Sequence, residues 1–218
     1  MLIAIDGPAA SGKSTTAKLL ATKLKIGYLD TGAMYRAITL KFLEENVDLK
    51  NIAEIQRVLD STKISLNYSE KGLTVLLDEK DVSEAIRTPE INKAISKISN
   101  IPEVRKKMVA LQRQIGQTGS WVVDGRDIGT VVFTNADLKI FMVATPEVRA
   151  KRRLIDYEAK GISASFDEIV DEIKKRDEYD SNRKHSPLKP AEDSILLDTS
   201  DLSLEEQVDF IYQKTKKI

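Results

Sequence analysis

A glycine-rich motif near the start of the chain constrains the fold more than any other part of the sequence. Residues 7–14 read GPAASGKS and match the pattern G-x-x-x-x-G-K-[ST] in full. The short apolar run Leu2–Ile5 precedes the motif, and from Ser14 onward apolar residues recur at helical spacing. Between a strand and a helix, such a motif turns backbone N–H groups inward around phosphate oxygens. We therefore predict a phosphate-binding loop, called the P-loop below, and a nucleoside triphosphate site.

The roles within this loop follow from the chemistry of the motif. Lys13 is expected to reach the β- and γ-phosphates, and the Ser14 hydroxyl is expected to bind Mg²⁺. Asp124 closes the apolar run Trp121–Val123 and is the second predicted Mg²⁺ ligand, in the manner of a Walker-B carboxylate. The residues predicted to bind the triphosphate are Gly7, Pro8, Ala9, Ala10, Ser11, Gly12, Lys13, Ser14 and Thr15.

Strand and helix patterns alternate along most of the chain, which predicts an α/β fold with a parallel sheet between layers of helices. The five predicted core strands are residues 2–5, 26–30, 121–124, 139–143 and 195–197. Helices are predicted from Ser14, over 33–45, 89–97, 102–117 and 146–161, and from capping-box residues Ser165 and Ser203. Residues 63–68 and 73–77, with a third strand near Val82, indicate a small inserted antiparallel sheet.

Composition excludes several classes of function. The 34 Lys and Arg residues balance the 34 Asp and Glu residues, so no overall positive field favours binding to nucleic acid. The chain has no cysteine, which excludes disulfides, thiolate metal sites and cysteine nucleophiles. Because the N-terminal apolar run is too short for a signal peptide or a membrane span, we expect a cytoplasmic protein that does not bind membranes.

Three further clusters are candidates for an acceptor site, because ligands in open α/β folds bind where parallel strands end. The clusters are residues 30–36 (DTGAMYR), 124–130 (DGRDIGT) and 176–183 (RDEYDSNR), and each is expected beside the end of a strand. Asp30 could orient the P-loop lysine or cap the following helix, and capping is the preferred interpretation. Asp6 is interpreted as structural.

The sequence resembles the bacterial cytidylate kinase family of nucleoside monophosphate kinases. The resemblance spans nearly the whole chain and rests on the P-loop, the DTGAMYR stretch, residues 86–88, the DGRDIGTVVF segment and residues 176–183. It implies phosphoryl transfer from ATP to CMP or dCMP. It further implies one kinase domain over 1–218, with a monophosphate-binding module at 31–118, an antiparallel insertion at about 63–83 and a lid at 149–183.

The resemblance also implies roles for individual residues. Arg36 and Arg126, helped by Thr31 and Tyr35, would bind the acceptor phosphate. Ser96 and Arg105 would donate hydrogen bonds to cytosine, and Asp127 would accept one from its N4 amine. A carboxylate there disfavours uracil, whose O4 would face an unpaired acceptor. Asp180 and Arg176 would lie near the ribose. The residues expected to stabilise the transferred phosphate are Lys13, Arg126, Arg149, Arg153, Arg176 and Arg183.

A phosphate that is already ionised can attack without a general base, which agrees with the single histidine, His185. Two alternatives remain open on the residues alone. One is a P-loop kinase for another small acceptor, such as UMP or shikimate. The other is a nucleotide switch, which the absence of an N-K-x-D motif disfavours. We expect a monomer.

Overall fold

Two compact units make up the chain. The computed structural model describes residues 1–69, 72–159 and 161–218. The first unit combines Met1–Leu29 with Gly116–Ile218, and the second is Asp30–Ile115. Among the described residues, every helix is too short or too polar to cross a bilayer.

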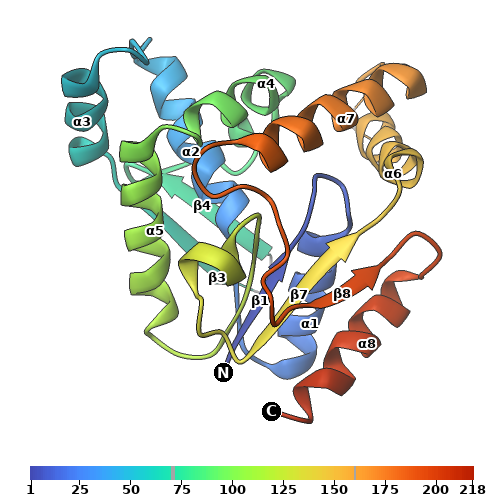
Figure 1. Ribbon diagram of the computed structural model, residues 1–218. Helices are drawn as coiled ribbons and strands as arrows, with labels where there is room; N and C mark the ends of the chain where they lie inside the picture. The colour runs from blue at the N-terminus through green and yellow to red at the C-terminus, as the bar shows by residue number, and fades with distance from the viewer. Residues whose placement is uncertain (70–71, 160) are drawn as a thin grey trace. The chain divides into compact units, whose positions relative to one another are not determined.

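A five-stranded sheet organises the first unit, and its strands follow the order β2-β6-β1-β7-β8. Figure 1 labels β1, β7 and β8 side by side in this sheet. β1 pairs in parallel with both β6 and β7, and β7 pairs in parallel with β8. The strands are β1 (Leu2–Asp6), β2 (Gly27–Asp30), β6 (Trp121–Gly125), β7 (Leu138–Val143) and β8 (Ile195–Asp198). The predicted parallel sheet is confirmed, and β1 lies at its centre, so the loop after β1 starts from the most enclosed strand.

Three helices of the first unit begin at side-chain caps that the sequence provides. Thr145 caps α6 with Pro146 at its first position, and Ser165 and Ser203 form capping boxes for α7 and α8. α1 and α8 lie side by side against the sheet (Figure 1), and α6 packs on α7. The helical elements are α1 (Lys13–Leu24), the π-helical turn η2 (Ile128–Val132), α6 (Pro146–Glu158), α7 (Phe166–Asn182) and α8 (Leu204–Thr215).

The core of this unit lies between β1, β6, β7 and the pair α1 and α8. Its side chains are apolar at alternate positions of the strands and at three- or four-residue spacing on the helices, as burial on one face requires. The largest contributors include Ile3, Ile5, Leu20, Tyr28, Ile140, Met142, Val208 and Ile211. Hydrophobic burial therefore fixes β1 and α1, and with them the two ends of the P-loop.

The second unit contains a three-stranded antiparallel sheet with the order β3-β4-β5, which confirms the predicted insertion. The predicted turn between its first two strands falls partly on residues 70 and 71, outside the described residues. The strands are β3 (Ile64–Ser69), β4 (Gly72–Leu77) and β5 (Lys80–Asp81). The helices are α2 (Thr31–Glu44), α3 (Ile52–Ser61), the short η1 (Ala85–Arg87), α4 (Pro89–Ile98) and α5 (Pro102–Gly116).

Two features differ from the sequence interpretation. α3 was not predicted, although Asn51 caps it and Ile55, Val58 and Leu59 are buried at helical spacing. The expectation that residues 176–183 lie beside the end of a strand is wrong, because they form the last turns and the C-cap of α7. The capping box at Ser165 starts a long helix whose far end carries these charges.

Candidate active site

The P-loop begins at a glycine that no other residue can replace without a shift of the backbone. Gly7 follows β1 with φ 156°, and a Cβ atom there would lie 2.2 Å from the backbone oxygen of Met142 on β7. At the other end of the loop, Lys13 opens α1, and its Nζ donates to the backbone oxygen of Pro8 at 3.1 Å. The lysine side chain thus folds back along the loop, as a phosphate-binding lysine does.

Three arginines donate hydrogen bonds to backbone oxygens of alternate P-loop residues. The bonds join Arg126 to Gly7 at 2.9 Å, Arg149 to Ala9 at 3.2 Å and Arg152 to Ser11 at 3.1 Å. These contacts hold the carbonyls and add positive charge around the loop, which favours a polyanionic ligand. Within the described residues the buried Ser11 Oγ has no hydrogen-bond partner, so a polar atom in the loop is available for a ligand.

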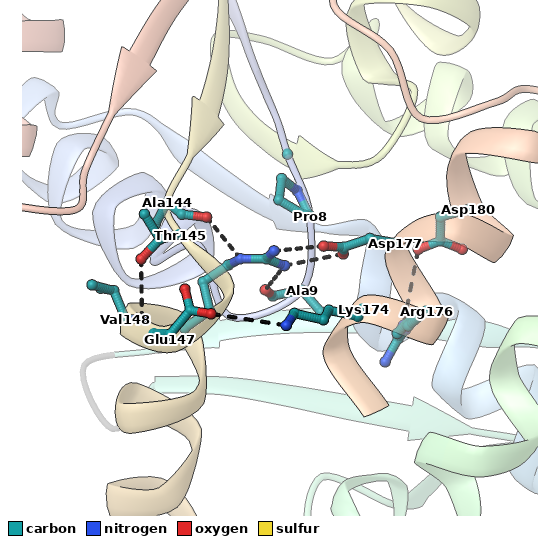
Figure 2. Close-up of polar contacts among 12 residues, drawn as sticks. Pro8, Ala9, Ala144, Thr145, Glu147, Val148, Lys174, Arg176, Asp177 and Asp180 are labelled. Atoms are coloured by element: carbon teal, nitrogen blue, oxygen red, sulfur yellow. Dashed lines mark hydrogen bonds and ion pairs between the residues drawn. The ribbon is translucent and has the colours of Figure 1, made fainter. Parts of the chain in front are cut away.

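Arg149 connects the P-loop to two helices. Its Nε donates to the Ala144 backbone oxygen at 2.9 Å, and its guanidinium pairs with the Asp177 carboxylate at 3.0 and 2.5 Å. Figure 2 shows Ala9, Ala144 and Asp177 gathered around this guanidinium. Arg149 is only 3% exposed. It therefore contacts the P-loop, as a role near phosphate requires, while being held by an acid on α7.

The other predicted lid arginine on α6 has different neighbours. Arg153 donates to the Tyr157 hydroxyl at 3.0 and 2.9 Å, and it lies 3.9 Å from a Glu172 carboxylate oxygen. These contacts tie α6 to itself and to α7. Arg152, which the sequence interpretation did not select, contacts the P-loop instead and also donates to Thr199.

The two predicted Mg²⁺ ligands are in direct contact. Ser14 Oγ donates to Asp124 Oδ2 at 2.6 Å, and the Tyr28 hydroxyl donates to Asp124 Oδ1 at 2.9 Å. Among the described residues, no three His, Cys, Asp or Glu side chains gather as a metal-binding group. A hydroxyl and one buried carboxylate fit Mg²⁺, because this ion usually takes one or two carboxylates and fills its other positions with phosphates and water.

Asp180 on α7 is the centre of an arginine cluster. Arg126 Nε lies 3.1 Å from Asp180 Oδ2, and Arg176 Nε lies 3.9 Å from the same oxygen. Burial alone raises the pKa of Asp180, but the charges of Arg126, Arg176 and Arg183 outweigh burial and hold the pKa below its ordinary value. The Asp180 carboxylate therefore stays ionised. It positions guanidiniums that were predicted from the sequence to bind the acceptor nucleotide.

Asp127 follows Arg126 at the end of β6 and is buried. Arg183, the C-cap residue of α7, places its Nη2 4.0 Å from Asp127 Oδ1. The first unit thus brings together five of the residues predicted to bind the acceptor. These residues are Arg126, Asp127, Arg176, Asp180 and Arg183.

The second unit carries the remaining predicted acceptor residues on three helices. Asp30 caps α2 by accepting a hydrogen bond from Ala33 N at 2.8 Å, which confirms the capping interpretation. Thr31 and Tyr35 are one turn apart and buried, and Arg36 is half-buried. Arg105 on α5 lies over the Tyr35 ring with its Cζ 5.9 Å from the centroid. Ser96 is half-buried on α4.

Asp6 is an additional charged residue beside the P-loop. Its carboxylate accepts hydrogen bonds from Ile128 N and Gly129 N, both at 2.8 Å. Burial raises the pKa of Asp6 to about 7, although the two backbone N–H groups oppose this change. The sequence showed an acid before the P-loop, but it did not show which backbone groups the acid binds.

This raised pKa predicts a dependence of stability on pH. An ordinary aspartate has a pKa of about 3.9, so between about pH 4 and 7 the folded state binds a proton that the unfolded state has released. The free energy of unfolding of the wild type should therefore fall across this range because of Asp6. Urea denaturation of Asp6→Asn and the wild type should show the variant gaining relative stability between about pH 4 and 7. A difference that stays constant with pH contradicts this prediction.

Comparisons with known proteins agree with this geometry. The family model described as "Cytidylate kinase" matches residues 3–217. The chain is 51% identical over 208 residues to a cytidylate kinase of Carboxydothermus hydrogenoformans, which covers 95% of this chain and 94% of the relative. It is 46% identical over 218 residues to that of Fusobacterium nucleatum, covering 100% of this chain and 98% of the relative.

Among solved structures, the shikimate kinase of Bacteroides thetaiotaomicron matches with a TM-score of 0.51 and 14% identity, covering 99% of this chain and 98% of that chain. At this identity the match supports the α/β fold only.

Proposed function

Because the chain belongs to the cytidylate kinase family, we propose which of its residues carry out the family's reaction, the transfer of the γ-phosphate of ATP to CMP or dCMP. One observation carries the proposal. Arg126 contacts the Gly7 oxygen in the P-loop and the Asp180 carboxylate in the arginine cluster. The triphosphate loop and a set of acceptor residues thus share one guanidinium.

The chemistry requires alignment and charge neutralisation. An oxygen of the CMP phosphate attacks the γ-phosphorus of ATP, the bond from that phosphorus to the β,γ-bridging oxygen breaks, and ADP and CDP result. The attacking oxygen is already ionised near neutral pH, so no side chain has to remove a proton. We assign stabilisation of the transferred phosphate to Lys13 and to the arginines Arg126, Arg149, Arg153, Arg176 and Arg183.

Mg²⁺ would be held by Ser14 and Asp124 together with the phosphates of ATP. When bound, it would neutralise charge on the β- and γ-phosphates. The Tyr28 hydroxyl donates a hydrogen bond to the second oxygen of Asp124 and thereby orients the carboxylate. Metal-binding side chains are commonly oriented by such hydrogen bonds from neighbouring residues.

Recognition of the acceptor is proposed for residues of both units. Thr31, Tyr35, Arg36 and Arg126 would bind the phosphate, and Arg176, Asp180 and Arg183 the phosphate and ribose side. Asp127 would accept from cytosine N4, while Ser96 and Arg105 would donate to the other base atoms. The support is chemical. The Asp127 carboxylate lies 4.0 Å from Arg183 Nη2, and the Arg105 guanidinium lies over the Tyr35 ring. We further propose a cytoplasmic monomer that does not bind nucleic acid, in agreement with the zero net charge.

A substrate panel tests this assignment. With ATP and Mg²⁺, CMP and dCMP should react at least about tenfold better in kcat/KM than UMP, because an unpaired buried acceptor costs about 1–3 kcal/mol. AMP and GMP complete the panel, and either of them reacting as well as CMP would contradict the assignment. Asp127→Asn should reduce the preference for CMP over UMP, since the amide can donate to uracil O4 as well as accept from cytosine N4. ATP affinity should stay unchanged. A CMP-to-UMP ratio that is equal in both enzymes contradicts the role of Asp127.

A further inference from the structure

Asp6 makes a contact that the reaction outlined above does not use. It is the last residue of β1 and directly precedes Gly7 of the P-loop. Each carboxylate oxygen accepts one backbone hydrogen bond, Oδ1 from Ile128 N and Oδ2 from Gly129 N, both at 2.8 Å. The Asp6 side chain therefore links the start of the P-loop to the turn that follows Asp127 by two hydrogen bonds.

The same turn is held on its other side. Arg126 Nη1 donates to the Gly7 oxygen at 2.9 Å, so residues 126–129 contact residues 6–7 through two separate links. The turn lies directly against Asp6, since a Cβ atom built on Gly129 would be in ordinary van der Waals contact with Asp6 Oδ2, at 3.5 Å. Asp127 sits between the two links. The position of Asp127 relative to the P-loop is consequently fixed by a hydrogen-bonded link on each side of it in the sequence.

The buried position disfavours the ionised form of Asp6. Asp6 is 5% exposed, and burial raises its pKa to about 7 despite the nearby Lys13 charge. The negative charge of Asp127 adds to this effect. Asp6 therefore holds the turn through its two directional hydrogen bonds and not through its charge. The two backbone N–H donors need two acceptor oxygens, and this side chain supplies both.

We propose that Asp6 is a positioning residue that holds Asp127 at a fixed place relative to the P-loop and thereby supports selection of the acceptor base. The inference rests on the proposed role of Asp127 in reading cytosine. Asp6 touches neither substrate. It acts through the backbone of Ile128 and Gly129.

The test substitutes Asp6→Asn in the full-length protein. The amide has a single acceptor oxygen, and its NH₂ group would face the second backbone N–H, so the turn must move. We expect the KM for CMP to rise about tenfold or more, while the KM for ATP changes less than about threefold. The preference for CMP over UMP should fall as well. A merely structural loss lowers the fraction of active enzyme and kcat without separating the two KM values.

The matched control is Asp137→Asn. Asp137 also accepts a backbone hydrogen bond, from Leu2 N at 2.7 Å, but at the opposite end of β1. This variant should keep wild-type KM values for both substrates. Asp6→Ser, which removes the charge and leaves a small polar group, should show the same separation of KM values as Asp6→Asn. It supplies a second measurement if the amide distorts the strand.

Parallel data on Asp127→Asn separate two kinds of failure. If Asp127→Asn alters base preference and neither Asp6 variant raises the KM for CMP, the inference about Asp6 is wrong and the proposed function stands. If Asp127→Asn leaves base preference unchanged, the proposed reading of cytosine is wrong. Equal increases in the KM for CMP and ATP in the Asp6 variants would also overturn the inference, because they indicate damage to the P-loop itself.

Discussion

Lys13→Met is expected to reduce kcat by about 10²–10³-fold or more, because it removes a preorganised charge aimed at the phosphates while charge redistributes in the transition state. Lys13 is 8% exposed, and its ammonium group already folds over the loop to Pro8. Methionine keeps most of the buried length of the side chain without the charge. Steady-state kinetics with ATP and CMP measure the effect.

The control for this substitution is Lys18→Met on the same helix. Lys18 is exposed on α1, so its replacement changes net charge by the same amount without entering the loop. It should leave kcat within about twofold of the wild type, since exposed substitutions rarely shift a protein by more than about 0.5 kcal/mol. A Lys13→Met enzyme that retains wild-type kcat would show that the P-loop lysine does not stabilise the transferred phosphate.

Asp124→Asn is expected to weaken the response to Mg²⁺. The substitution keeps the shape of the side chain but replaces one of the two carboxylate oxygens, of which Oδ2 accepts from Ser14 and Oδ1 from Tyr28. The Mg²⁺ concentration that gives half-maximal rate should rise about 10–100-fold, and kcat at low Mg²⁺ should fall in proportion. Calorimetric titration of ATP with and without Mg²⁺ gives a second readout. The gain in ATP affinity caused by Mg²⁺ should shrink.

Asp201→Asn is the matched control for this experiment, because Asp201 is exposed in the segment before α8. It should leave both the Mg²⁺ dependence and ATP binding unchanged. If Asp124→Asn shows the Mg²⁺ dependence of the wild type, Asp124 is not a Mg²⁺ ligand. Its role would then be limited to orienting Ser14 and Tyr28.

Features encoded by neighbouring residues were predictable from the sequence. The P-loop motif, the caps at Ser165 and Ser203 and the parallel strands all depend on contacts within a few residues or on regular hydrophobic spacing. α3 was not predicted, although it also had local signals, the cap Asn51 three residues before Glu54 and apolar residues at helical spacing. The fold followed from the sequence because burial and capping act locally.

The choice of partner for each charged side chain depended on the tertiary structure. Arg149 reaches the Ala9 oxygen across 140 residues of chain, and Arg126 reaches the Gly7 oxygen across 119. Arg152 was not among the predicted arginines although its guanidinium contacts the P-loop. Asp6 was interpreted as structural, but its bonds to Ile128 and Gly129 were not predicted. A basic helix has several arginines of equal local propensity, and only packing decides which one faces the loop.

The sequence by itself determined that this chain folds around a parallel sheet and carries a phosphate-binding motif in its first loop, because motif, spacing and caps are local properties. Only the tertiary structure decided which guanidiniums contact that loop and which acid fixes the turn beside Asp127. The physical reason is that hydrogen bonds between distant segments depend on distances of a few ångströms, which no pattern of neighbouring residues encodes.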